Sequence, residues 1–273
     1  MRPRLDRLEV GIAGLGTIGT AVARALDGGI DGLRLAAIAT RTREKALARM
    51  EEFSRPVPIL TLQELAKRVN VVVECVPAAA FTEVALPALE AGCILITVSG
   101  GALMQHLDLV ELAKRSGGRI ILATGALLGL DAIRAAAEGR IDSVTMVTRK
   151  PPRSLAGAPY LETHNIDITD LREPLKVFEG SAAEGALGFP ANVNVAAAVG
   201  LAGIGTEATR LEIWADPHLN RNTHTIKVEA NSARFEMCIE NVPTEENPAT
   251  GTITALSVID TLRGLVNPLR VGS

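Results

Sequence analysis

A glycine-rich turn near the start of the chain constrains the fold most. Gly14-Leu15-Gly16-Thr17-Ile18-Gly19 reads G-x-G-x-x-G and stands between the apolar run Leu8–Ala13 and the Ala- and Val-rich stretch Thr17–Leu26. Between a strand and a helix, the first glycine permits a tight turn, the second lets backbone approach a pyrophosphate, and the third allows close helix–strand contact. The free N–H groups and the positive partial charge at the start of the helix can then bind the phosphates. Gly14, Gly16, Thr17, Ile18 and Gly19 are therefore candidate dinucleotide-binding residues. A glycine-rich turn in another kind of α/β protein is the alternative.

The rest of the first 122 residues supports the dinucleotide-binding interpretation. Apolar runs alternate with helical patterns, which predicts βαβ units and a parallel sheet covered on both faces. A length of 273 residues favours about two domains, at roughly 150 residues per domain. We expect a Rossmann domain over 1–122. Its expected strands are Leu8–Ala13, Leu35–Ala39, Val71–Cys75, Ile94–Val98 and Ile120–Leu122, and its expected helices are Thr17–Leu26, Thr42–Phe53, Thr61–Lys67 (capped by Thr61), Ala79–Ala91 and Met104–Arg115.

A second domain is expected over 123–249, where the pattern changes to alternation of polar and apolar residues. Such a period of two is typical of a sheet with one solvated face. We therefore expect an α+β substrate domain with a mixed or antiparallel sheet, and a C-terminal segment, about 250–273, that packs back on the first domain. The strands expected in the second domain are Asp142–Arg149, Thr209–Ala215, Thr223–Glu229 and Ala233–Ile239, and its expected helix is Asn194–Leu201. A further helix, Thr252–Leu265, is expected in the C-terminal segment.

Composition excludes several classes of function. The net charge of −3 provides no basic field for nucleic acid, and 3% aromatic residues provide few stacking platforms. The longest stretch of small apolar residues, 195–205, is too short to span a membrane, which takes about 20 residues. The three cysteines form no CxxC pair, so neither a metal site nor a disulfide framework is expected. The start of the chain lacks the apolar core of a signal peptide. We expect a cytoplasmic protein without nucleic-acid or membrane partners.

The end of the second strand predicts which dinucleotide is bound. An NAD site has an acidic residue there to accept from the ribose hydroxyls, whereas this chain has Ala39-Thr40-Arg41-Thr42-Arg43. Thr40 can hydrogen-bond a phosphate oxygen, and Arg41 can pair with that phosphate and stack on adenine. We therefore predict that NADP is preferred over NAD. The alternative is that Arg41 and Arg43 are solvated residues at a helix start.

His224 is the candidate acid/base residue. It follows the polar loop 216–222 and lies at the start of the next expected strand, Thr223–Glu229. An imidazole there can hold or transfer a proton near neutral pH, as reduction of C=N or C=O requires. A structural role is the alternative. The competing histidines lack such a context: His106 falls on a helix of the first domain, His164 in a polar stretch, and His218 within the loop itself.

At this point the motifs resemble a known family. The sequence is similar to the L-aspartate dehydrogenases through nearly its whole length. The residues that carry the resemblance are Gly14–Gly19, Ser99–Leu103, Gly125–Ala132, Thr148–Pro152, Phe189–Ala197, Asp216-Pro217 and Asn222-Thr223-His224. The Phe189–Ala197 and 216–224 segments are the specific signals. Ala123-Thr124-Gly125 departs from the Pro-Ser-Gly more usual in the family, and Thr40-Arg41 departs from its acidic NAD version.

The resemblance implies the activity and the site residues. It implies NAD(P)-dependent oxidation of L-aspartate to iminoaspartate, which hydrolyses to oxaloacetate and ammonia, and the reverse reductive amination. By resemblance His224 is the active-site histidine, and Ala126 with Asn192 or Asn194 contacts the nicotinamide half of the cofactor. An Asn amide can orient the carboxamide of that ring. Arg149, Lys150 and Arg221 are candidates for the substrate carboxylates or for solvated positions. We expect a homo-oligomer, dimeric or larger, that acts in amino-acid metabolism and NAD biosynthesis.

Two rival interpretations remain open. One is another two-domain reductase, similar to homoserine dehydrogenase or dihydrodipicolinate reductase, whose lysine-bearing motifs are not evident here. The other is a sensor that binds NADP without chemistry, and it predicts no turnover and no loss on removing His224.

Overall fold

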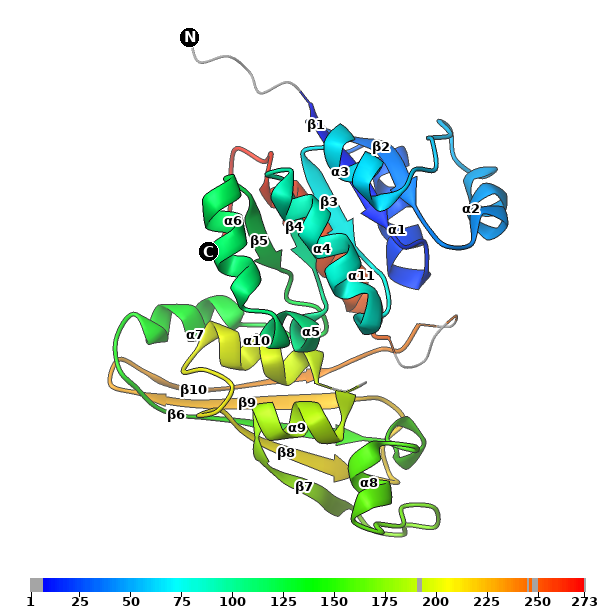
Figure 1. Ribbon diagram of the computed structural model, residues 1–273. Helices are drawn as coiled ribbons and strands as arrows, with labels where there is room; N and C mark the ends of the chain where they lie inside the picture. Colours follow the sequence, from blue (N-terminus) through cyan, green and yellow to red (C-terminus); the bar gives the residue numbers. More distant parts are fainter. Residues whose placement is uncertain (1–6, 191–192, 245, 247–249, 273) are drawn as a thin grey trace. The chain divides into compact units, whose positions relative to one another are not determined.

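The computed structural model describes residues 7–190, 193–244, 246 and 250–272, and it divides into two compact units (Figure 1). The first unit holds Gly125 and the described residues before it, together with Thr254–Val271. The second unit holds the described residues of Ala126–Ile253. No helix in these described parts is long and apolar enough to cross a membrane.

A parallel sheet forms the centre of the first unit. Its order is β2-β1-β3-β4-β5, and Ile59 adds an isolated parallel bridge to Ile38 outside β2. From β1 the chain first adds β2 and the Ile59 bridge on one side, and then returns to add β3, β4 and β5 on the other side. This reversal of strand order is the dinucleotide-binding topology. The strands are β1 (Leu8–Ala13), β2 (Leu33–Ala39), β3 (Val71–Glu74), β4 (Ile94–Thr97) and β5 (Arg119–Leu122).

Helices cover both faces of this sheet. Successive side chains along each strand point to opposite faces, and the apolar side chains on both faces are buried against helices. One apolar cluster joins the sheet to α1, α2 and α11, and a second joins it to α3, α4, α5 and α6. Figure 1 shows α3, α4 and α6 on one face and α11 on the other. The helices are α1 (Thr17–Asp27), α2 (Arg43–Met50), α3 (Leu62–Arg68), η1 (Ala78–Ala80), α4 (Phe81–Glu90), α5 (Gly100–Gln105), α6 (Asp108–Ser116) and α11 (Thr252–Gly264).

Two local features test the expected helix boundaries. The predicted cap is confirmed: Thr61 accepts from the Glu64 backbone N–H, and the Glu64 carboxylate accepts in return from the Thr61 N–H. The single helix expected over Met104–Arg115 is wrong, since α5 ends at Gln105 and α6 begins at Asp108. His106 leaves helical geometry and stacks on Phe81, and Asp108 then places an acid in the first turn of a new helix.

The second unit is built on a mixed sheet. Its order is β10-β9-β6-β8-β7, in which β6 and β8 are parallel and the other pairs antiparallel. Alternate residues such as Met146, Ile213 and Ile226 are buried, and α7, α9 and α10 lie along one face (Figure 1). The strands are β6 (Ile141–Lys150), β7 (Leu175–Ser181), β8 (Arg210–Ala215), β9 (Thr223–Ala230) and β10 (Arg234–Glu240), and the helices are α7 (Leu130–Ala137), η2 (Pro152–Ser154), α8 (Pro159–Thr163), α9 (Ala182–Gly188) and α10 (Asn194–Ala202).

Candidate active site

The three glycines of the turn have different physical roles. A Cβ on Gly14, whose φ is +93°, would lie 2.4 Å from the Cys75 carbonyl oxygen, and a Cβ on Gly19 would lie 2.0 Å from the Gly14 oxygen. A Cβ on Gly16 would meet nothing within 4 Å. The first and third glycines are therefore required by the packing of the turn itself. The second borders open space, which fits the close backbone approach of a pyrophosphate.

The start of α1 fits a phosphate group. Thr17 and Ile18 are the first helical residues and are half-buried, and their N–H groups have no acceptor inside the helix, so they can donate to a bound phosphate. Arg49 of α2 donates to the Leu15 carbonyl oxygen and, over 2.9 Å, to the Thr20 hydroxyl. This guanidinium fixes the turn from outside the motif, and the motif alone does not point to it.

Thr40 and Arg41 lie beside the glycine turn. The Gly14 N–H donates to the Ala39 carbonyl oxygen over 2.8 Å, so the end of β2 and the turn are adjacent. The Thr40 hydroxyl accepts from the Thr42 N–H, and the Arg41 guanidinium lies 3.3 Å from the Glu83 carboxylate. Both partners of that ion pair are largely exposed, so the pair contributes little and leaves the guanidinium available.

A buried carboxyl group stands at the end of β3. Glu74 is 1% exposed, accepts from the Thr97 hydroxyl over 2.5 Å, and accepts from the Val76 N–H over 2.9 Å. Burial raises the pKa of this carboxyl group against the opposing effect of those hydrogen bonds. The contacts tie the ends of β3 and β4 together near the glycine turn.

In the second unit, His224 lies in β9 directly opposite Thr148 of β6. The imidazole Nδ1 and the Thr148 hydroxyl are 3.1 Å apart, and both side chains are buried. Lys150, two residues beyond Thr148, shares their face of the sheet and is also buried. When Nδ1–H donates to the hydroxyl oxygen, Nε2 carries the free lone pair and can accept a proton.

Burial lowers the pKa of both basic groups in this cluster. Desolvation, followed by the positive charge of Lys150, lowers the pKa of His224 to about 3. Desolvation also lowers the pKa of Lys150 to about 8. His224 is therefore a neutral imidazole at pH 7, suited to hydrogen bonding and to accepting a proton transiently. Lys150 holds a proton that it can release near physiological pH.

The low pKa of His224 predicts acid sensitivity. An unfolded histidine takes up a proton near pH 6.5, whereas the buried one resists it down to about 3. The stability from the neutral imidazole is thus complete above pH 6.5 and is lost as the pH falls toward 3, by about 1.4 kcal/mol per pH unit. Urea unfolding at pH 7 and pH 5, followed by the fluorescence of the single tryptophan, Trp214 in β8, measures it. The His224→Gln variant should show a shallower pH dependence, and an unchanged one would contradict the prediction.

The other predicted residues of this unit have varied surroundings. The Ala126 carbonyl oxygen accepts from the Asn241 side-chain Nδ2 over 3.1 Å. Asn194 is the exposed first residue of α10, whereas Asn192 lies outside the described residues. Arg149 pairs with Asp216 over 3.1 Å and covers the Trp214 ring, on the opposite face of the sheet from Lys150. In the part of the chain that the structure describes, no three His, Cys, Asp or Glu residues gather as a metal-ion site.

Comparisons with known proteins match both halves of the chain. Residues 131–265 match the family described as "Aspartate dehydrogenase, C-terminal", and residues 14–123 match "Homoserine dehydrogenase, NAD binding domain". An L-aspartate dehydrogenase of Bradyrhizobium diazoefficiens is 53% identical, over 98% of this chain and 95% of that protein. L-aspartate dehydrogenase 3 of Bordetella bronchiseptica is 49% identical, over 98% of each chain. The crystal structure of aspartate dehydrogenase from Thermotoga maritima has a TM-score of 0.75 at 27% identity, covering 97% of this chain and 99% of that one.

A parallel sheet with a G-x-G-x-x-G turn, followed by a mixed-sheet unit with a buried histidine, defines an oxidoreductase that uses a nicotinamide cofactor. The relatives are similar over both units and not over the cofactor domain alone. The chain belongs to the L-aspartate dehydrogenase family. The expected family and fold class are thus confirmed.

Proposed function

We propose that this protein oxidises L-aspartate with NAD(P) to iminoaspartate, which hydrolyses to oxaloacetate and ammonia, and that it also runs the reverse reductive amination. The similarity to L-aspartate dehydrogenases over 98% of the chain carries the proposal. The buried Thr148–His224 pair at 3.1 Å supports it, because imine hydrolysis needs a positioned group that handles protons.

The proposed reaction has two stages, oxidation of the amine and hydrolysis of the imine. The substrate amine loses a proton, and C2 loses a hydride with its electron pair, which leaves a C=N bond. The nicotinamide cofactor, when bound, accepts that hydride. Water adds to the imine carbon, a proton moves to nitrogen, and ammonia leaves. We assign His224 Nε2 as the site that accepts the proton of the attacking water and returns it to the departing nitrogen, with Thr148 holding the ring.

Residues for the cofactor are proposed in both units. Gly14, Gly16, Thr17, Ile18 and Gly19 would hold the pyrophosphate, since the turn fits it. Ala126 and Asn192 or Asn194 would contact the nicotinamide half, an assignment that still rests on the family resemblance.

We also propose that NADP is preferred through Thr40 and Arg41. Arg41→Ala should raise the KM for NADP about 10- to 100-fold, because the variant loses one charge-assisted hydrogen bond to the 2′-phosphate. The KM for NAD, which has no such phosphate, should stay nearly unchanged. Steady-state kinetics with each cofactor measures this. Arg34→Ala, at the other end of β2, is the matched control. Equal effects on NADP and NAD would refute the assignment.

The direct test of the activity is oxidation of NADPH or NADH with oxaloacetate and ammonium, beside the reverse assay with L-aspartate. Turnover that requires both oxaloacetate and ammonium supports the proposal. Turnover with other carbonyl or imine substrates instead would favour another two-domain reductase, and tight NADPH binding without turnover would favour a sensor.

Assembly and location are further parts of the proposal. The face of the second sheet opposite α7, α9 and α10 carries part-exposed side chains, Trp214 among them, and we propose that it contributes to a homo-oligomer. All three cysteines are free thiols, which supports a reducing compartment such as the cytoplasm.

A further inference from the structure

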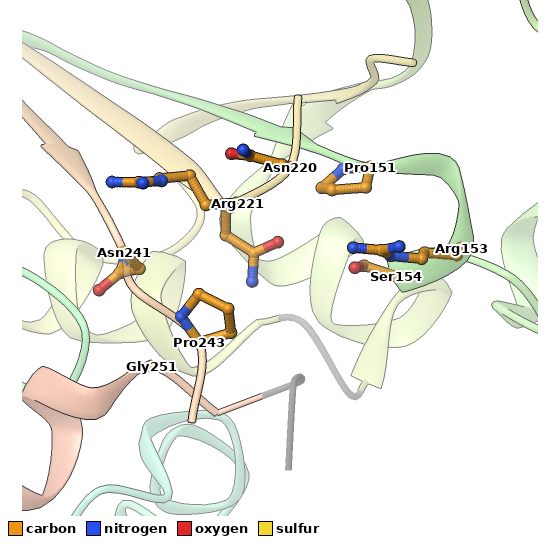
Figure 2. Close-up of a pocket in the computed structure, with 9 residues that line it drawn as sticks. Pro151, Arg153, Ser154, Asn220, Arg221, Asn241, Pro243 and Gly251 are labelled. Atoms are coloured by element: carbon orange, nitrogen blue, oxygen red, sulfur yellow. The ribbon is translucent and has the colours of Figure 1, made fainter. Parts of the chain in front are cut away.

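A small pocket that opens to solvent lies in the second unit at the edge of the mixed sheet (Figure 2). It is bordered by η2 after β6, by the loop before β9, and by the chain that follows β10. Among its lining residues, Pro151 directly follows Lys150 in the chain, and Asn222 precedes His224 by two residues. Its lining residues are Pro151, Arg153, Ser154, Asn220, Arg221, Asn222, Asn241, Pro243 and Gly251.

The pocket is cationic. Among the residues that the structure describes, two arginines and no acidic residue line it, and neither the Arg153 nor the Arg221 guanidinium makes an ion pair or a hydrogen bond with these residues. Figure 2 shows the Arg153 guanidinium and the Ser154 hydroxyl directed inward from one side, whereas the Arg221 side chain extends toward the side of Asn241. Each of these two guanidinium groups can bind a carboxylate through a pair of N–H groups.

Asn241 adds an unmet acceptor to this pocket. Its side chain is 4% exposed, its Nδ2 donates to the Ala126 oxygen over 3.1 Å, and its backbone N–H donates to the Asn222 oxygen over 2.8 Å. The amide is thereby fixed, and its Oδ1 is buried without a hydrogen-bond partner among the described residues. A Cβ at Gly251 would lie 3.0 Å from that oxygen, so any residue larger than glycine would crowd it there. An unpaired buried acceptor is costly unless a ligand N–H satisfies it.

We infer that this pocket is the binding site for an amino dicarboxylate, in which Arg153 and Arg221 bind the two carboxylates and Asn241 Oδ1 accepts an N–H of the amino group. The inference rests on the proposed function and deepens it by naming the residues that select the substrate. A phosphate satisfies the arginines but has no N–H for Asn241. A carboxamide satisfies Asn241 but brings no charge for the arginines, whereas an amino dicarboxylate satisfies both.

Binding to NADPH-saturated enzyme, which cannot oxidise L-aspartate, tests the inference by calorimetry. Arg153→Gln and Arg221→Gln should each weaken L-aspartate and succinate about 10- to 100-fold, because each variant loses a charge-assisted contact. Asn241→Ala should weaken L-aspartate about 5- to 10-fold and leave succinate unchanged, because succinate has no amino group. Arg234→Gln, at the far end of the β9–β10 pair, is the matched control and should change neither. Thermal melting of each variant establishes that it is folded.

The outcomes separate this inference from the proposed function. Unchanged succinate and L-aspartate binding in both arginine variants would overturn it, even where the wild type oxidises L-aspartate. Loss of succinate binding in both variants would support the dicarboxylate site, even where the wild type shows no turnover. A weaker NADPH affinity in Asn241→Ala, with L-aspartate binding unchanged, would assign the amide to the cofactor and overturn its role toward the amino group.

Discussion

Replacing His224 with alanine should lower kcat for L-aspartate oxidation by about 100- to 10,000-fold, with the dissociation constant of NADPH unchanged. The buried imidazole is held by Thr148 at 3.1 Å and stays neutral at pH 7, because desolvation lowers its pKa to about 3. It can therefore accept a proton at Nε2 during imine hydrolysis, and a methyl group cannot. Initial rates with saturating L-aspartate, together with NADPH binding, measure the effect.

Two further variants show whether the loss belongs to proton handling at this position. Thr148→Val keeps the shape of the threonine but removes the hydroxyl that orients the ring, so kcat should fall by less than in His224→Ala. His164→Ala removes an exposed histidine that stacks on Tyr160, and it should leave kcat unchanged. A folded His224→Ala enzyme with near-normal kcat would exclude the proposed role.

Gly19→Ala and Gly16→Ala should have different effects: the first should lower the stability of the protein, and the second should weaken cofactor binding. At Gly19 the new Cβ would stand 2.0 Å from the Gly14 oxygen, so the free energy of unfolding should fall by about 1–3 kcal/mol or more. At Gly16 nothing lies within 4 Å, so stability should change by less than about 0.5 kcal/mol. The Gly16 methyl group would instead occupy the space for a pyrophosphate, and NADPH affinity should fall at least about tenfold.

Urea unfolding and fluorescence titration with NADPH distinguish the two variants. The account requires Gly16→Ala to be stable but weak in cofactor binding. A Gly16→Ala protein that binds NADPH as the wild type does would show that the pyrophosphate is held elsewhere. Gly29→Ala, at a positive-φ glycine in the loop after α1 with nothing within 4 Å, controls for a strained backbone alone.

Much of the first unit could be predicted because local signals determine it. The apolar run Leu8–Ala13 and the glycine turn each reflect short-range geometry, and the structure places a strand and a helix start there. The isolated bridge at Ile59 could not be predicted, because Pro56 and Pro58 argue against a strand in this segment. The position is extended only through its pairing with Ile38.

The second unit was less predictable because its sheet is assembled from distant segments. The strand β7, Leu175–Ser181, lacks regular alternation and ends in Gly180-Ser181, and its neighbour β8 lies about thirty residues further on. The parallel pairing of β6 with β8 likewise has no local signature.

The candidate site shows the same division. His224 could be predicted from its place after a polar loop, but its burial and its contact with Thr148 depend on the register of β6 and β9. The pocket residues Arg153 and Asn241 could not be predicted, since they meet only when three separate chain segments reach one edge of the sheet.

The most direct test of the central claim follows the hydrogen at C2 of the substrate. Incubation of the enzyme with NADP and L-aspartate deuterated at C2 should give reduced cofactor that carries the deuterium at C4 of the nicotinamide ring, with ammonia and oxaloacetate released in equal amounts. Mass spectrometry of the cofactor reads the result. Reduced cofactor without deuterium, or no reduction while NADPH still binds tightly, would contradict the assignment of L-aspartate as the hydride donor.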